Sequence, residues 1–357
     1  MEPALAYCCI VLLTIVGCSN APNAASDEVR GFLGDVALDS CADQAQPVLV
    51  RCGGDVAPGS IAAVCGDLEA ESRVTVAGGS LAVSGHSRIA APLHVSSCFT
   101  GFAGIRADGS EDVAGDLSTA GDWLVGSPAH VGGNANVGGK LYARNDVAVH
   151  GVLHAKDVDM TNVTASTLAE TIAARDPLRC ELAPTPSATI SRLEAGAFVD
   201  LRYALSAHSQ QARVQLGCAT YRFDSFGIDN ELRLHIKGHT VIVVDGDVHI
   251  ASPMRVELEP DARLDLLIGG SLEVDSQLSF SGGSTWLAVG GDVRITAPMQ
   301  LEGMLSAPRS AVSLTDGSPD NVLNVTGTLL VGSLHVASPV TVTASAEPPL
   351  PVCRPSE

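Results

Sequence analysis

Aromatic residues and positive charges are both scarce in this chain. Phe, Trp and Tyr together make up 4% of the 357 residues, although globular cores commonly rely on these side chains. Lys and Arg number 21 against 40 Asp and Glu, which gives a formal net charge of −19. Such a surface repels phosphate groups, so the composition argues against nucleic acid as a partner and disfavours electrostatic binding to anionic lipid. The plentiful Val and Leu instead favour a folded β protein with a core of small aliphatic side chains.

The sequence motifs of common enzymes and metal sites are also missing. No GxSxG, HExxH, P-loop or GxGxxG pattern occurs, and neither does the GGxGxD calcium repeat. No CxxC is present, so zinc ribbons and thioredoxin-like redox sites have no support. We therefore expect no catalytic residues, no metal site and no cofactor.

An apolar run and a cysteine stand near the start of the sequence. Residues 5–16 have the length of a signal-peptide core and are too few to span a bilayer as a helix. The run ends in Ile15-Val16-Gly17-Cys18, which resembles the bacterial lipobox. This predicts that residues 1–17 are removed and that Cys18 becomes a lipid-bearing N-terminus attached to a membrane. The alternative is a buried apolar N-terminal strand, because Met1-Glu2-Pro3 lacks the usual basic residue.

The expected location is the cell envelope. Ser19 follows the cysteine in place of the aspartate often linked to retention in the inner membrane, which favours the outer membrane. Surplus cysteines fit export, since disulfides form outside the cytoplasm. We favour a Cys180–Cys218 link and pairs within a second group, although sequence alone does not fix the connectivity. Removal of residues 1–17 leaves seven cysteines besides Cys18, an odd number, so we expect at least one to be free or to pair with another molecule. That second group consists of Cys41, Cys52, Cys65 and Cys98, and Cys353 is the seventh.

Internal repeats are the strongest structural signal. Segments 245–256, 269–280, 290–301 and 331–342 share a Gly, an Asp or Ser, alternating aliphatic residues, a small corner and another short strand. The first three segments begin at similar intervals, and the fourth begins after about twice that interval. Alternation of period two predicts short strands with one buried face, and a longer period of this size is typical of one turn of a parallel β-helix. The rival is an antiparallel sandwich of hairpins, which predicts closer turn signals.

The first half carries a looser version of this pattern. Gly-Asp and Gly-Ser corners recur there, and intervals near six residues begin at Val131. Between the halves, segments 166–175 and 191–209 have apolar residues three and four apart, which predicts short amphipathic helices. The expected fold is an all-β, right-handed parallel β-helix in two sections with a short helical insertion between them. The expected divisions are a signal peptide (1–17), a tether (18–30), an N-terminal solenoid section (31–160), a helical and Pro-rich connector (161–215), a C-terminal parallel β-helix (216–345) and a Pro-rich tail (346–357).

The stretch from about Cys180 to Val342 resembles a known pattern. A Gly-Cys pair leads into a Tyr-containing strand at 217–221. A hydrophobic strand that begins with Gly and ends in Asp-Gly-Asp follows at 238–247, and an Ala-Pro corner stands at 307–308. It is similar to the uncharacterised β-helical surface domain of myxobacterial-type lipoproteins and pilus-associated bacterial proteins. The first half resembles bactofilins more weakly. The resemblance implies a right-handed parallel β-helix and no catalytic residues.

A few Asp and His residues are candidates for a catalytic or metal-binding role. Asp247 aligns in the repeats with Ser271, Asp292 and Ser333, which predicts a corner residue that caps backbone donors. An alternative is that Asp247 and Asp292 lie on adjacent turns and serve as paired carboxylates of a polysaccharide lyase or hydrolase. His150 with His154, and His235 with His239, are each four residues apart, whereas His249 and His335 take equivalent outward positions. We interpret these histidines as exposed decoration and not as metal ligands.

The leading functional hypothesis is a lipid-tethered, non-enzymatic rod with a structural, adhesive or scaffolding role. Its expected partners are the membrane, through the lipid, and an envelope glycan or protein, or further copies of itself. The enzyme that processes polysaccharide is the alternative.

Overall fold

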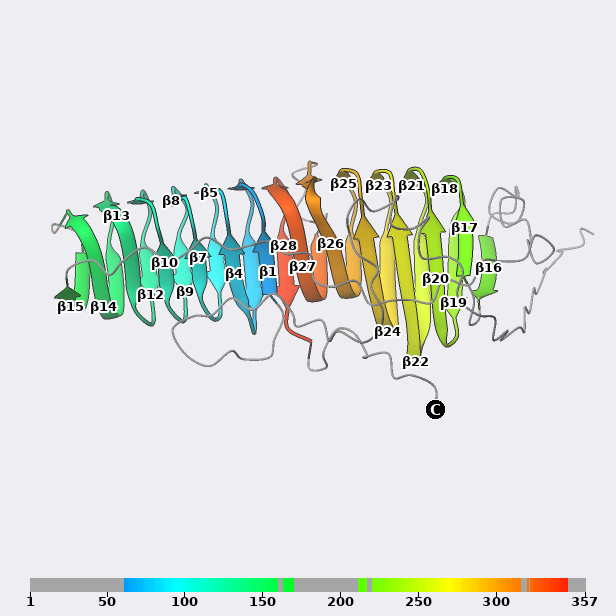
Figure 1. Cartoon of the computed structure of the whole chain (residues 1–357), viewed down its shortest axis with the longest axis horizontal. Helices are drawn as coiled ribbons and strands as arrows, with labels where there is room; N and C mark the ends of the chain where they lie inside the picture. Colours follow the sequence, from blue (N-terminus) through cyan, green and yellow to red (C-terminus); the bar gives the residue numbers. More distant parts are fainter. Residues whose placement is uncertain are drawn as a thin grey trace, which may run out of the picture.

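The computed structural model is built of parallel strands wound into a solenoid of about 11 turns (Figure 1). It describes residues 61–159, 163–169, 211–216, 220–315, 320 and 322–345. Within these residues the 28 strands form one continuous sheet and no helix occurs. The expected all-β class and the parallel solenoid are therefore confirmed.

The N-terminal section consists of strands three to twelve residues long. They are β1 (Ile61–Val64), β2 (Leu68–Ala70), β3 (Val74–Ala77), β4 (Ser80–Val83), β5 (His86–Ile89), β6 (Leu93–Val95), β7 (Phe99–Gly101), β8 (Gly104–Ala107), β9 (Glu111–Val113), β10 (Leu117–Thr119), β11 (Trp123–Val125), β12 (Ala129–Val131), β13 (Ala135–Ala143), β14 (Val147–Val158) and β15 (Val163–Ala169).

The C-terminal section combines strands as short as three residues with four strands of 12 to 16 residues. They are β16 (Gln211–Leu216), β17 (Thr220–Phe223), β18 (Phe226–Ile228), β19 (Glu231–Ile236), β20 (His239–Val244), β21 (Val248–Ile250), β22 (Met254–Ile268), β23 (Leu272–Val274), β24 (Leu278–Val289), β25 (Val293–Ile295), β26 (Met299–Leu314), β27 (Leu323–Val336) and β28 (Val340–Thr343).

A spacing of six residues sets the core of the N-terminal section. Leu81, Phe99, Leu117 and Ala135 follow one another at equal intervals in one ladder. Three short strands complete a turn, and every sixth residue from 93 to 153 points inward and is buried. Since parallel strands are about 4.8 Å apart, these side chains, most of which are aliphatic, stack into a continuous interior that needs few aromatics. The interval near six residues that the sequence indicated is thus confirmed.

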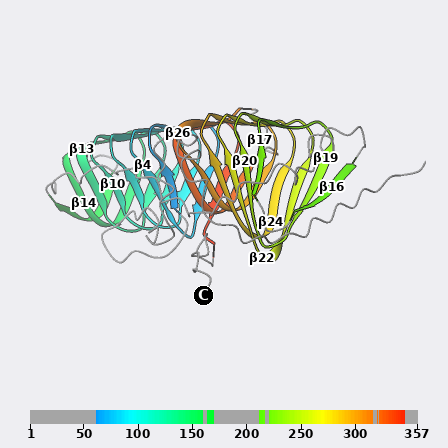
Figure 2. The same cartoon turned by 45° about the vertical axis from the view of Figure 1, so that its right-hand side comes forward.

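The two sections are stacked in an order opposite to their order in the sequence. Strands β1 and β2 pair with β27, and β3 pairs with β28, so the first turn of the N-terminal section lies on the last turn of the C-terminal one. Figure 1 shows β15 and β16 at opposite ends of the rod, and Figure 2 shows β14 and β16 far apart in the same way. The chain therefore enters the rod at mid-length, and residues 170–210 link its two ends in sequence.

The expected helix over 166–175 is wrong where the structure describes it. Residues 163–169 form β15, which pairs in parallel with β14. The physical reason is that β14 offers a row of backbone donors and acceptors, and the Thr-rich segment extends its ladder. Residues 170–175 and the second expected helix over 191–209 lie outside the described residues.

A second apolar cluster lies on the outward side of one face. In β22, Leu264, Leu266 and Ile268 belong to the interior core, whereas Leu267 points the other way. Leu267 is only 1% exposed and packs in a cluster with apolar residues of β1, β20, β24, β26 and β27. Apolar residues on both faces explain why β20 and the end of β22 read as unbroken hydrophobic runs.

Candidate functional site

Aspartates at the Gly-Asp corners bind the backbone of the next turn. Asp247 Oδ1 accepts a hydrogen bond from the Ser271 amide at 2.8 Å, and Asp292 Oδ1 accepts one from the Ala311 amide at 3.1 Å. Asp67, Asp116 and Asp122 do the same in the N-terminal section at 2.7 to 2.8 Å. The corner-capping interpretation of the repeats is therefore confirmed for Asp247 and extends to both sections.

The enzyme hypothesis placed Asp247 and Asp292 on adjacent turns, and this is wrong. Val248 pairs with Leu272, and Leu272 pairs with Val293, so Ser271 lies between the two aspartates in the ladder. The two carboxylates are two turns apart, which is about 10 Å. The alignment of the repeats already contains this order, because the segment that begins at residue 269 lies between the segments that hold the two aspartates.

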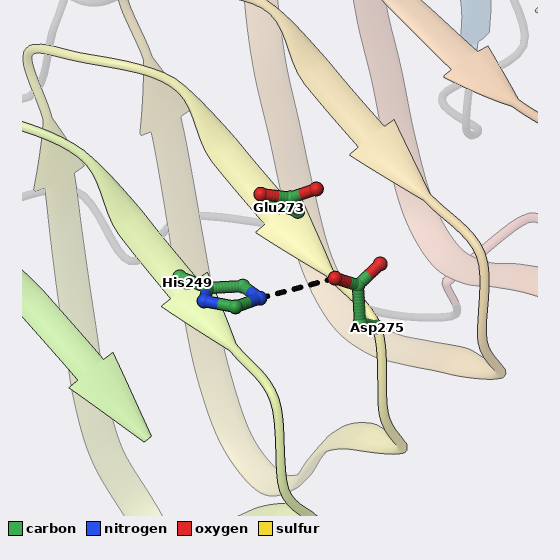
Figure 3. Close-up of side chains that lie close together, drawn as sticks. All are labelled: His249, Glu273 and Asp275. Carbon is green, nitrogen blue, oxygen red and sulfur yellow. Dashed lines mark hydrogen bonds and ion pairs between the residues drawn. The ribbon is translucent and has the colours of Figure 1, made fainter. Parts of the chain in front are cut away.

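Three ionisable side chains meet on the outward side of β21 and β23 (Figure 3). His249 Nε2 lies 3.0 Å from Asp275 Oδ2, and Glu273 stands beside them. One ligand atom from each of the three lies within 4.8 Å of the others, a spacing that a metal ion could occupy. The exposed histidine position was expected, whereas the two acidic partners were missed. The signal lay in the repeat register, where His249 pairs with Glu273 and Glu273 with Arg294.

A cation from the protein itself already neutralises this cluster. The Arg294 guanidinium contacts Glu273, and its Nη2 lies 3.3 Å from Asp275 Oδ1. The Thr296 hydroxyl donates to the same oxygen at 2.7 Å. This hydrogen bond first, and then His249 and Arg294, outweigh partial burial and lower the pKa of Asp275. The arrangement suits an ion-pair network that ties neighbouring turns together, and a metal ion would have to displace Arg294.

A buried charged group lies on the outward side of β20 and β22. Asp265 is fully buried and its two oxygens accept from His239 Nε2 at 2.8 Å and Arg263 Nε at 2.7 Å. Arg263 is only 5% exposed. Because a buried carboxyl group needs polar partners, the contacts with Arg263 and His239 account for the presence of Asp265 at this place.

The histidine pairs suggested by sequence spacing are not brought together. His235 contacts Glu259 at 3.5 Å, whereas His239 contacts Asp265 on another face. His150 meets His130 of β12, while His154 belongs to the part of β14 that pairs with β13. In both cases the chain turns a corner between the two residues. His335 contacts Glu69 across the junction of the two sections at 3.4 Å.

The predicted lipid and disulfide positions are mostly beyond the described part of the chain. This holds for Cys18, Cys41, Cys52, Cys180 and Cys218, so the lipid and the Cys180–Cys218 link stay predictions. Cys65 follows the end of β1 and Cys98 precedes β7, with β4 between those strands. Their positions differ by four residues along the strands and two turns across them, on the order of 15 Å, which is too far for a bond to each other.

No helix in the described part of the chain is long and apolar enough to cross a membrane.

Comparison with protein families finds a match over part of the chain. Residues 183–347 are similar to a domain of unknown function, DUF7305. These residues hold the C-terminal section and somewhat less than half of the chain. Neither a search of curated proteins nor a search of solved structures found a match.

Proposed function

We propose that the protein is a lipid-anchored component of the bacterial cell envelope with a structural, adhesive or scaffolding role and no catalytic activity. The observation that carries this proposal is the single rod made by the two sections, which share one sheet across their junction. Its interior is filled by apolar side chains, and its outward positions stand in register from turn to turn. A rigid body that holds outward side chains in rows along its length suits display or scaffolding.

The alternative, an enzyme that processes polysaccharide, is less well supported. It requires carboxylates that can reach a sugar, and the two aspartates considered for it are engaged as backbone caps. The carboxylates of the His249 cluster are paired with Arg294. These contacts favour a role of the acids in stability over one in catalysis.

The finer features of the proposal come from the sequence. They are removal of residues 1–17, lipid attachment at Cys18, an outer-membrane location and kinship with the myxobacterial-type surface domain. We further propose right-handed winding, supported by the strong general preference of parallel crossover connections for that hand.

The decisive test of the anchor is metabolic labelling with a clickable fatty acid. The wild-type chain is expected to incorporate the label, and Cys18→Ala is expected to incorporate none. Cys8→Ala is the matched control and should label as the wild type does. Equal labelling of wild type and Cys18→Ala would contradict the anchor.

Light scattering after size-exclusion chromatography separates the possible roles. A monomer that stays constant with concentration supports display of a surface, and filaments that grow with concentration support self-assembly. Depolymerisation of an acidic glycan that Asp247→Asn or Asp292→Asn abolishes would overturn the non-catalytic proposal.

A further inference from the structure

Three histidines and one aspartate form a row on the outward side of strands β6, β9, β12 and β14 in the N-terminal section. His94, Asp112 and His130 occupy the same outward position in β6, β9 and β12, because Asp112 is the direct ladder partner of both histidines. His150 follows on the next turn, at the end of the first part of β14. All four side chains face solvent to a large extent.

Asp112 holds the ring of His130 in one orientation. Its Oδ1 lies 3.1 Å from His130 Nδ1, and its Oδ2 lies 2.9 Å from His94 Nδ1. A carboxylate only accepts hydrogen bonds, so Nδ1 of each histidine carries the proton. In a neutral imidazole this leaves Nε2 of His130 with an available lone pair. A carboxylate behind a histidine is the arrangement that orients metal-ligating imidazoles.

The Nε2 atom of His130 lies close to a second imidazole nitrogen. His130 Nε2 and His150 Nε2 are 3.3 Å apart, and the two rings are perpendicular with centroids 4.7 Å apart. Two nitrogens bound to one tetrahedral Zn²⁺, each about 2.05 Å from the metal, lie about 3.3 Å from each other. The two nitrogens therefore already have the separation that a shared cation requires.

We propose that His130 and His150 bind one divalent transition-metal cation of the Zn²⁺, Cu²⁺ or Ni²⁺ class, with Asp112 as the positioning residue for His130. Imidazole nitrogen is a ligand that these cations favour. The site differs from the His249 cluster in one decisive respect, because there Arg294 supplies a positive charge beside the acids. The two remaining coordination positions are open to water or to a donor from another molecule. The proposal does not depend on lipid attachment.

Titration of the full chain with ZnCl₂ by isothermal calorimetry tests the site, with a purification tag that contains no histidine. Wild type is expected to bind one Zn²⁺ in a way that saturates. Both His130→Ala and His150→Ala should weaken this binding at least about tenfold. Asp112→Ala should weaken it by about 10- to 100-fold, and Asp112→Asn, which can still accept from His130, should recover part of the loss.

Two control variants make the outcome decisive. His94→Ala removes the other partner of Asp112, and His249→Ala disrupts the second cluster, so both should bind Zn²⁺ as the wild type does. Thermal unfolding followed by circular dichroism checks that every variant is folded, which is expected for exposed positions. Absence of saturable binding by wild type would overturn the proposal. So would a loss on His249→Ala, or equal losses for His94→Ala and His130→Ala.

Discussion

Glu111 occupies a position that the rest of the N-terminal section fills mainly with small or apolar side chains. It lies in the series of every sixth residue, between Ile105 and Leu117, and is 2% exposed. Its Oε2 accepts a hydrogen bond from Trp123 Nε1 at 2.8 Å. Burial raises the pKa of Glu111 from 4.5 to about 7, against a smaller opposing effect of the Trp123 hydrogen bond. The folded state therefore prefers the neutral acid.

The first prediction concerns pH. A carboxyl whose pKa is higher in the folded state stabilises the fold below pH 4.5 relative to higher pH, because above 4.5 the unfolded chain ionises first. The loss grows until about pH 7, where the folded protein ionises too, and reaches roughly 3 kcal/mol at 1.36 kcal/mol per pH unit. Denaturant unfolding between pH 4 and 8 measures it.

Glu111→Gln is the matched variant, since it keeps the acceptor for Trp123 and cannot ionise. The difference in unfolding free energy between wild type and Glu111→Gln should shift in favour of the variant by roughly 3 kcal/mol from pH 4 to pH 7. A difference that does not change with pH would show that Glu111 is not a buried neutral acid.

Sequence reasoning reached some of these residues and missed others. The corner role of Asp247 followed from alignment of the repeats. The interval of six residues was recognised only from Val131 onward, and its extension back to residue 93 would have placed Glu111 in the core. The contact between His130 and His150 was harder to foresee, because the two are not direct ladder partners as Asp112 and His130 are. His150 stands two residues beyond Ala148, the ladder partner of His130, and only the bend of the chain at that corner brings the two rings together.

At the scale of elements, the corner is the repeated unit that specifies the fold. Four of the capping aspartates, Asp67, Asp116, Asp122 and Asp247, stand beside a glycine of the next turn, so the aspartate and the glycine depend on each other. Asp292 differs, because Ser310 precedes the amide that it caps. A Cβ on Gly270 would overlap Asp247 Oδ1 and lie 2.6 Å from the Gly246 carbonyl carbon. Gly85 and Gly139 meet Asp67 and Asp122 in the same way. Glycine is thus required at these corners because neighbouring turns approach so closely.

We predict that Gly270→Ala destabilises the fold by about 1–3 kcal/mol, since the added methyl group forces the turns apart. Gly227→Ala is the matched control, because a Cβ at Gly227 meets nothing within 4 Å. Guanidinium unfolding at constant pH measures both. A Gly270→Ala protein as stable as the control would contradict the close approach of the turns.

The repeated short strands could be predicted from the sequence, whereas the strand over residues 163–169 could not. Alternating aliphatic residues bounded by Gly and Pro specify short strands whatever their neighbours are. Leu168 and Ile172 are four residues apart, a spacing that fits one face of a helix and one face of a strand equally well. The ladder of β14 decides between them for residues 163–169.

At the scale of the molecule, the order of the sections could not be read from the sequence. Every turn offers the same backbone donors and acceptors to its neighbours. The local sequence pattern therefore does not show which turn of one section pairs with which turn of the other. Pairing of Leu68 with Leu334 and of Val74 with Val340 joins the two extremes of the described chain. Only the three-dimensional fit of the two sections fixes that choice.

The junction predicts a pattern of amide hydrogen exchange. Strands β1, β3, β27 and β28 have neighbours on both sides, so their amides should be protected like those of interior strands. Strands β15 and β16 stand at the two ends of the rod in Figure 1 and should exchange faster. Exchange measured by mass spectrometry tests this. Rates in β1 and β3 as fast as those in β15 would mean that the two sections do not stack in solution.

Entry of the chain at mid-rod changes how the molecule would respond to force. Any tether that begins at Cys18 joins the sheet at β1, and β1 lies against β27 near the middle of the rod (Figure 1). A lipid at Cys18 would then attach the rod near its middle, and the two ends of the rod would extend in opposite directions from the attachment point. A pull on either tip would act as a lever about the anchor, so the junction of the two sections would carry the bending load.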